Sequence, residues 1–354
     1  MNPLVGVRLD RVPVDRSAAS ATPGGDWPDV MLHVMSGKGG TGKTTVAAAL
    51  ALALASDGRR VMLMEVEGRQ GLAQLFDTSP LPYDERKLTV APGGGEVWGL
   101  AVDPEEALLD YLELFYNLRR AGSVLRRMGA VDFATTIAPG LRDVLLTGKA
   151  VELVRRKDKK NGQSYDAIVL DAPPTGRITR FLNVNTEIAG LAKVGPIRNQ
   201  ADSVMAVLRS EKTAVHLTTL LEEMPVQETA DGVAELRDAA LPVGGIVVNM
   251  TRPPMLDESD LVLASGPGLA RAQIADGVAA AGLGTAKSKA GKAITDALLA
   301  EAVDHAARVN LEATERESIN ALGQPVYELP FLAGGMDIAA LYELSRLLRE
   351  EGMA

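Results

Sequence analysis

One glycine-rich stretch constrains the fold more than any other part of the chain. Residues Gly37–Thr44 read Gly-Lys-Gly-Gly-Thr-Gly-Lys-Thr and match the pattern G-x-x-x-x-G-K-[ST]. The mostly apolar residues Met31–Ser36 before it predict a buried strand, and the apolar residues Val46–Ala55 after it predict a helix. A strand, a glycine loop and a helix in this order are the context of a phosphate-binding loop, or P-loop. The alternative is a plain glycine turn between two core elements.

The residue types in this loop suit a nucleoside triphosphate with Mg²⁺. Glycines allow backbone N–H groups to curl around a phosphate, and the N-terminus of the following helix favours an anion. Lys43 is expected to reach the β and γ phosphates, and the Thr44 hydroxyl is expected to hold Mg²⁺. The predicted nucleotide-binding residues of the loop are Gly37, Gly39, Gly40, Thr41, Gly42, Lys43, Thr44 and Thr45.

The overall composition excludes several other kinds of site. The chain has 354 residues, a formal net charge of −9 and no cysteine. Without cysteine there is no disulfide, no Cys-ligated zinc and no iron–sulfur cluster. The acidic balance disfavours nucleic acid as a partner, and the basic run Arg155–Lys160 lacks aromatic residues and is interpreted as a solvated helix end. No apolar run predicts a membrane span and no signal peptide is visible, so a cytoplasmic protein without stable membrane insertion is expected.

Alternating strand and helix patterns predict an α/β fold. Residues 1–28 are rich in Pro, Ser, Ala and Gly and predict a flexible tail. Residues 29–354 predict a single P-loop ATPase domain, a doubly wound and mostly parallel sheet of about seven strands with helices on both faces. Helical insertions are expected at about 104–160, 186–210 and 256–322; the first has apolar residues at helical spacing and the last is rich in alanine. Asp77–Gly95 is predicted to be a loop because it contains three prolines and three consecutive glycines.

Carboxylates follow two of the predicted strands. The strand Arg60–Glu65 leads into the loop Glu65–Gly71, which should lie beside the phosphate site because the carboxyl ends of parallel strands share one edge. Glu67 is therefore predicted to orient the attacking water, with Glu65 a weaker candidate; a merely exposed acidic loop is the alternative. The apolar strand Asp166–Asp171 ends in a carboxylate, a Walker B pattern in which Asp171 supports Mg²⁺ through water.

A stiff loop comes directly after Asp171. It contains two prolines and a glycine, so it can act as a hinge that senses the γ-phosphate. The residues assigned to this switch II loop are Pro173, Pro174, Thr175 and Gly176.

Four motifs in this order resemble one family. They are Gly37–Thr45, the switch II-like Asp171–Gly176, Pro225–Thr229 and Val247–Asn249. Together they resemble the family of the arsenical pump-driving ATPase and of the guided-entry ATPase that targets tail-anchored membrane proteins. These are signature-lysine P-loop ATPases, and the second lysine of the loop, Lys38, matches the signature lysine.

The resemblance implies an Mg²⁺-dependent ATPase in which nucleotide drives dimer closure. Lys38 would cross the dimer interface to the partner's nucleotide, Thr44 would bind Mg²⁺ and Asp171 would support it. Asn249 and the loop at Pro330 and Phe331 would contact adenine. Because each chain has one P-loop, the resemblance implies a homodimer or a heterodimer with a related ATPase chain, acting on a client that the sequence does not identify.

The sequence departs from the family pattern at several points. Switch I carries Glu67-Gly68-Arg69 in place of Asp-Pro-Ala, and the longer side chain of Glu67 predicts slow hydrolysis. The interface zinc and thiolate binding of arsenite are excluded because cysteine is absent. Residues 256–322 contain no methionine or aromatic residue and so predict a poor groove for membrane-protein clients. Arg177 stands where the family tends to have histidine.

Three hypotheses follow from these features. The first is a self-sufficient Mg²⁺-dependent ATPase with Lys38, Lys43 and Glu67 as catalytic residues. The second is a regulatory ATP-binding subunit that hydrolyses little and pairs with a related chain. The third is a positioning ATPase of the septum-site or partition type, which the acidic charge disfavours.

Overall fold

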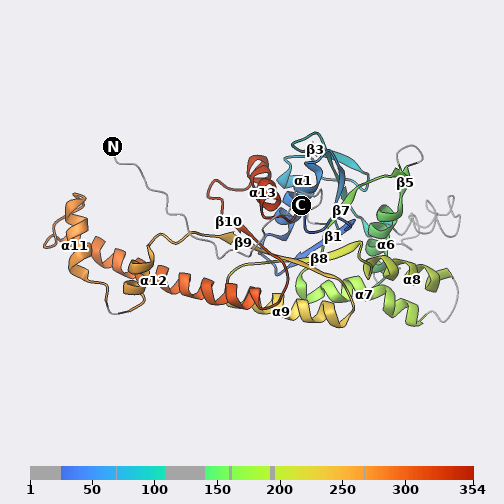
Figure 1. Ribbon diagram of the computed structural model, residues 1–354. Coiled ribbons are helices and arrows are strands. Elements are labelled where there is room, and N and C mark those ends of the chain that lie inside the picture. Colours follow the sequence, from blue (N-terminus) through green and yellow to red (C-terminus); the bar gives the residue numbers. More distant parts are fainter. Residues whose placement is uncertain (1–24, 69, 108–139, 159–161, 192–195, 267) are drawn as a thin grey trace.

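A computed structural model describes residues 25–68, 70–107, 140–158, 162–191, 196–266 and 268–354 (Figure 1). Its centre is an eight-stranded sheet in the order β10-β9-β8-β1-β7-β2-β4-β3. All neighbouring strands are parallel except β3 and β4, which are antiparallel. The strands are β1 Leu32–Gly37, β2 Arg60–Glu65, β3 Arg86–Val90, β4 Glu96–Ala101, β7 Ala167–Asp171, β8 Thr213–Thr219, β9 Val243–Thr251 and β10 Val326–Pro330, and a separate hairpin joins β5 Lys157–Asp158 to β6 Gly162–Gln163.

Helices cover both faces of this sheet. One face carries α1 Lys43–Ala55, the short α2 Gly71–Leu75 and α13 Ile338–Glu350. The other face carries α6 Leu141–Arg155, α7 Thr175–Leu191, α8 Pro196–Leu208 and α9 Glu223–Asp238. Each face has its own apolar core. The predicted doubly wound α/β fold is therefore confirmed.

The central strands and α1 have apolar residues at nearly every position, so none of their faces suits contact with water and they are buried. All six residues of β1 are buried, between β7 and β8. Helix α1 is packed between the sheet and α13, and every residue from Val46 to Ala55 is buried. A helix that is apolar all round needs such a place in the interior.

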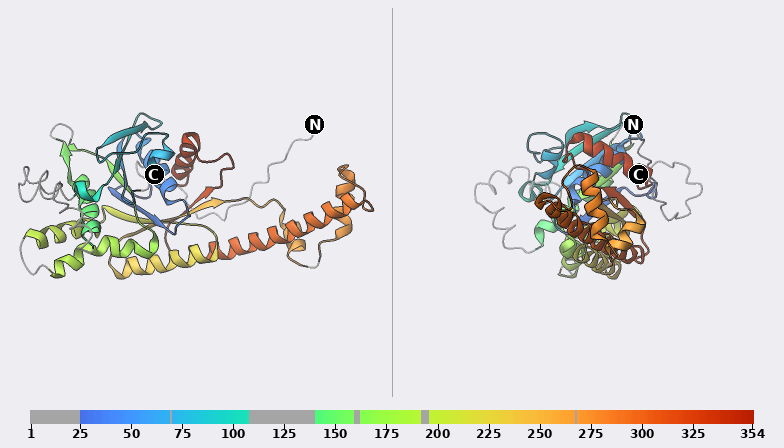
Figure 2. Two further views of the ribbon diagram at one scale, coloured as in Figure 1. Left: turned by 180° about the vertical axis from the view of Figure 1, so that it is seen from behind. Right: turned by 90° about the vertical axis from the view of Figure 1, so that its left-hand side faces the viewer.

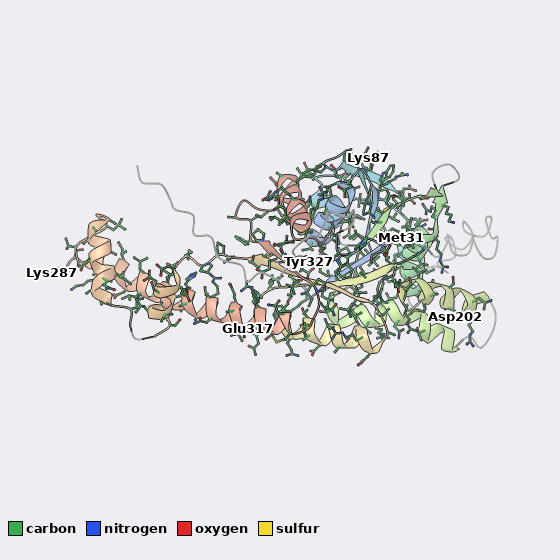
Figure 3. The ribbon with its side chains drawn as sticks, in the orientation of Figure 1. Met31, Lys87, Asp202, Lys287, Glu317 and Tyr327 are labelled. Atoms are coloured by element: carbon green, nitrogen blue, oxygen red, sulfur yellow. The ribbon has the colours of Figure 1, made fainter. Side chains whose placement is uncertain are left out.

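A helical arm projects from the body between β9 and β10 (Figures 1 and 2). It comprises α10 Glu258–Ala264, α11 Arg271–Ala280 and the long α12 Lys289–Asn320. Figure 3 shows Lys287 at the far end of the arm and Glu317 near its base. Only the end of α12 joins the core, where Ile319 is fully buried.

The sheet has eight strands where about seven were expected, and the additional strand is β3. It lies within Asp77–Gly95, so the prediction of a loop there was wrong. β3 is an edge strand whose side chains are exposed or half-buried. It pairs only with β4, and no apolar run of its own marks it in the sequence.

Several predicted segments fall partly outside the described residues, and so does Arg69 of the predicted switch I. Of the predicted tail, residues 1–24 lie outside, whereas Asp26 and Trp27 contact the body: the Tyr327 hydroxyl donates to Asp26 Oδ2 at 2.7 Å, and Trp27 Nε1 donates to that hydroxyl at 3.0 Å. Of the predicted insertions, residues 108–139 and 159–160, residues 192–195 and residue 267 also lie outside. Among the described residues, no helix is both long enough and apolar enough to pass through a bilayer.

Candidate active site

The glycine loop joins β1 to α1 at the centre of the sheet. Gly42 has a φ of 88° and is the N-cap residue of α1, and no side chain in the described part of the protein caps the helix. A Cβ on Gly42 would lie 2.4 Å from Asn249 Nδ2, so both the backbone conformation and the space require glycine there. At Gly39 and Gly40 a Cβ would meet nothing within 4 Å. The loop is thus packed against β9 on one side and open on the other, next to uncapped N–H groups that suit an anion.

Thr44 and Asp171 form a direct pair below this loop. The Thr44 hydroxyl donates to Asp171 Oδ2 at 2.7 Å, while Asp171 Oδ1 is buried with no hydrogen-bond partner among the described residues. Burial raises the pKa of Asp171 to about 6; Lys43 and the Thr44 hydroxyl lower it, and Glu65 and Glu67 raise it further.

A buried carboxylate oxygen without a partner fits a bound cation or its water. Within the described part of the chain, no three His, Asp or Glu side chains form a metal site by themselves. Thr44 and Asp171 therefore suit an ion that takes its other ligands from phosphate and water, as Mg²⁺ does. When bound in a P-loop, Mg²⁺ neutralises charge on the β and γ phosphates.

Each lysine of the loop faces a carboxylate of the same chain. Lys43 Nζ is 3.7 Å from Glu67 Oε2, and both side chains are largely buried. Lys38 Nζ is 2.7 Å from Glu228 Oε1 on α9, and both of these side chains are partly exposed. A phosphate that enters the loop would therefore compete with Glu67 for Lys43, and Lys38 could reach a nucleotide only by leaving Glu228.

Glu228 also connects the switch II residues to the glycine loop. Thr175 is buried, and its hydroxyl donates to Glu228 Oε2 at 3.3 Å. The Ser36 hydroxyl donates to the Pro173 carbonyl at 2.6 Å. Pro174 and Gly176 continue this segment into α7, and a Cβ on Gly176 would meet nothing within 4 Å.

The opposite end of the site is formed by β9 and the loop after β10. Asn249 Nδ2 donates to the Thr41 carbonyl at 2.9 Å, so this side chain holds the loop directly. Pro330 ends β10, and Phe331 N–H donates to the Thr251 carbonyl at 2.9 Å. The half-exposed Phe331 ring lies under the Arg252 guanidinium, 4.3 Å from it. Such a planar surface beside a phosphate loop suits an adenine ring.

The sequence of the chain is similar to proteins of one known family. Residues 31–211 match the family described as anion-transporting ATPase. The chain belongs to this family. The resemblance predicted from the four motifs is confirmed, and the P-loop described above lies within the matched segment.

Relatives of the anion-transporting ATPase family match over different shares of the chain. ATPase BagA of Mycobacterium tuberculosis is 50% identical over 331 residues, which cover 92% of this chain and 96% of that protein. ATPase GET3 of Kluyveromyces lactis is 26% identical over 260 residues, 64% of this chain and 73% of that protein. The arsenical pump-driving ATPase of Acidiphilium multivorum is 26% identical over 253 residues, 65% of this chain and 41% of that protein.

Sequence reasoning did not identify two residues of this candidate site. Glu228 was visible only as part of the Pro225–Thr229 motif, and its contact with Lys38 depends on how α9 packs. Arg252 carries no sequence signal. Arg177, for which the sequence indicated no role, places Nη2 at 4.0 Å from Asp143 Oδ1 on α6. Thr45 lies in the first turn of α1 and is half-buried.

Proposed function

We propose that this chain is an Mg²⁺-dependent ATPase whose nucleotide state opens and closes a dimer. The observation that carries the proposal is the Thr44–Asp171 hydrogen bond directly below the uncapped N-terminus of α1. It places a hydroxyl, a buried carboxylate and free backbone N–H groups at one point, which is what a Mg²⁺–triphosphate requires.

The contacts of Lys43 and Glu67 suggest how the site would change on binding. In the structure, Glu67 neutralises the ammonium group of Lys43. When the β and γ phosphates take over Lys43, the Glu67 carboxylate is released and can orient a water for in-line attack. Glu67 is one methylene longer than the family's aspartate, and we infer that hydrolysis is slow because the water is held less well.

The dimer is inferred from Lys38 and from the single P-loop. Lys38 is paired with Glu228 in its own chain, and it would have to leave Glu228 to reach a partner's nucleotide. A homodimer or a heterodimer with a related ATPase chain would supply the second site. The cytoplasm, which holds ATP, is the expected compartment, and the client is left unassigned.

A regulatory subunit with little hydrolysis is the second candidate. The observation that favours it is the glutamate at position 67, which pairs with Lys43 in place of the shorter aspartate of the family. Such a chain would bind ATP and complete the site of a related partner. A positioning ATPase gains no support from the described surface, since the net charge is −9.

The deciding experiment measures phosphate release from Mg-ATP by the purified chain alone. Lys43→Ala sets the background, and Lys289→Ala is the matched control because Lys289 is the exposed first residue of α12. We expect turnover that falls at least about 100-fold in Lys43→Ala and is unchanged in Lys289→Ala. Turnover that survives Lys43→Ala would refute the proposal. ATP binding without turnover, in folded protein, would favour the regulatory subunit.

A further inference from the structure

A second buried carboxylate lies at the carboxyl end of β2. Glu65 is only 2% exposed. Its Oε1 accepts a hydrogen bond from the Gly71 N–H at 2.9 Å, which holds the carboxylate in place. Its Oε2 is buried and has no hydrogen-bond partner among the described residues. A carboxylate oxygen buried in this way is costly unless a ligand or water satisfies it, so it indicates a missing partner.

Glu65 lies beside the residues proposed to hold Mg²⁺. β2 and β7 are parallel neighbours, and Glu65 is in register with Asp171. Side chains of in-register residues on adjacent strands point to the same face of the sheet. Both carboxylates therefore face α1, and each has one buried oxygen without a partner in the described part of the chain.

Gly71 shows how closely Glu65 approaches Thr44. A Cβ added to Gly71 would lie 3.2 Å from Thr44 Cγ2, 4.0 Å from the Thr44 hydroxyl and 3.8 Å from Glu65 Oε1. The loop after β2 thus brings Gly71 against the first turn of α1. The Glu65 carboxylate, the Thr44 hydroxyl and the Asp171 carboxylate converge on one small region.

We propose that Glu65 is a third protein group of the Mg²⁺ site, where its carboxylate accepts hydrogen bonds from Mg²⁺-bound water. The inference rests on the proposed function, because it needs a Mg²⁺–nucleotide in the P-loop. Mg²⁺ in phosphate sites keeps several waters, and an outer carboxylate orients them and strengthens metal binding. Glu65 is a positioning residue in this assignment, since it acts through water.

A purely structural role for Glu65 makes a different prediction. Gly71 opens the five-residue α2, whose N-cap residue Gln70 provides no side-chain cap. Glu65 could serve only to hold the Gly71 N–H. Glu65→Gln separates the two roles, because the amide oxygen can still accept from Gly71 while the negative charge is lost.

The experiment titrates Mn²⁺ into the full chain bound to the ATP analogue AMP-PNP and follows free Mn²⁺ by electron paramagnetic resonance. We expect Glu65→Gln to weaken Mn²⁺ binding about 10-fold, at the lower end of the loss typical of outer-shell ligands. Affinity for AMP-PNP in EDTA should not change. Glu235→Gln is the matched control, because it removes the same charge from the exposed side of α9.

The other possible results of the Mn²⁺ titration distinguish failure of the Glu65 assignment from failure of the proposed function. Unchanged Mn²⁺ affinity in Glu65→Gln would overturn the assignment and leave Glu65 as a helix-capping group. Failure of the wild-type chain to bind AMP-PNP at all would instead refute the proposed function. If Glu65→Gln does not fold by circular dichroism, Glu65→Asp replaces it: its shortened carboxylate should again weaken Mn²⁺ binding, and wild-type affinity in that variant would count against the proposal.

Discussion

Helices α1 and α12 are both rich in alanine, yet they occupy opposite environments. Eleven of the 13 residues of α1 are buried, whereas only five of the 32 residues of α12 are. Helix α1 lies between the sheet and α13, while α12 projects from the body, where it packs on α10 and α11 and reaches α9 at its base. Alanine favours a helix in either place, so the flanking residues and the tertiary contacts decide where that helix lies.

The N-termini of α1 and α12 also differ, in whether a side chain caps the helix. Ser288 caps α12, and its hydroxyl accepts from the Gly291 N–H at 3.0 Å. Helix α1 begins after Gly42 with no side-chain cap. The arm helix thus has a side-chain cap, whereas α1 has none among the described residues, like α6 and α9. What distinguishes α1 is the glycine loop before it and the Thr44–Asp171 hydrogen bond beside its first turn.

The largest expected contrast comes from adding the same side chain to both helices. Ala51→Leu in α1 should cost about 3 kcal/mol of the free energy of unfolding, because the site is fully buried and cannot expand. Ala313→Leu on the exposed side of α12 should stay within about 0.5 kcal/mol. Urea unfolding of both variants measures the difference. Equal losses would show that the arm is packed as tightly as the body.

Acid should weaken the body through two buried histidines. His33 Nδ1 and His216 Nε2 are 3.1 Å apart on the α1 side of the sheet, next to the Trp27 ring. Burial, helped by the charge of Arg59, lowers the pKa of His33 to about 3, and burial with the influence of His33 lowers the pKa of His216 well below its usual value. The unfolded chain therefore takes up protons that the folded chain does not.

This linkage sets the direction of the pH effect. The stability is fully present above the unfolded pKa of about 6.5 and is lost as the pH falls below it. His33 alone should cost about 2 kcal/mol between pH 7.5 and 5, and His216 adds to the loss. Urea midpoints at the two pH values test this. The control is His33→Gln with His216→Gln, in which the slope should flatten; an unchanged slope would assign the acid effect to other groups.

Removing the cap of the arm should have a smaller and local effect. Ser288→Ala leaves the Gly291 N–H without its acceptor, so the first turn of α12 should lose about 1 kcal/mol. Hydrogen exchange at the start of α12 measures this loss. Ser259→Ala is a control, since the N-cap acceptor of α10 is Asp257. Nucleotide binding should not change, and a weakened affinity would show that the arm and the P-loop are coupled.

The smallest effects are expected at two ion pairs near the surface, one in the body and one in the arm. Lys38–Glu228 spans 2.7 Å at the P-loop, and Arg271–Asp296 spans 2.6 Å in the arm. Glu228→Gln and Asp296→Asn should each change stability by only about 0.2–1 kcal/mol. Because Glu228 competes with phosphate for Lys38, only Glu228→Gln should tighten AMP-PNP binding, by up to about 5-fold. The same gain in a Lys38→Ala background would contradict this competition.

The sequence was most informative where one local pattern determines the structure. The range predicted for the strand Arg60–Glu65 is the range observed for β2, because its central residues form a continuous apolar run. The glycine loop predicted the strand, the turn and α1 together. Glu65 was undervalued because sequence position cannot tell a buried oxygen without a partner from an exposed one. The Lys38–Glu228 contact joins residues far apart in the chain, so only the packing of α9 could show it.

The arm also has a mechanical consequence. The arm is connected to the body by β9 and β10, which pair with each other. Asn249 near the end of β9 donates a hydrogen bond to the Thr41 carbonyl of the P-loop. Glu328 in β10 forms a 2.7 Å ion pair with Arg316 of α12. A 32-residue helix is about 48 Å long, so a tilt of about 5° at its base would carry the tip through about 4 Å. The molecule thus has the proportions of a lever, in which a small tilt at the base of α12 would displace its far end by several ångströms.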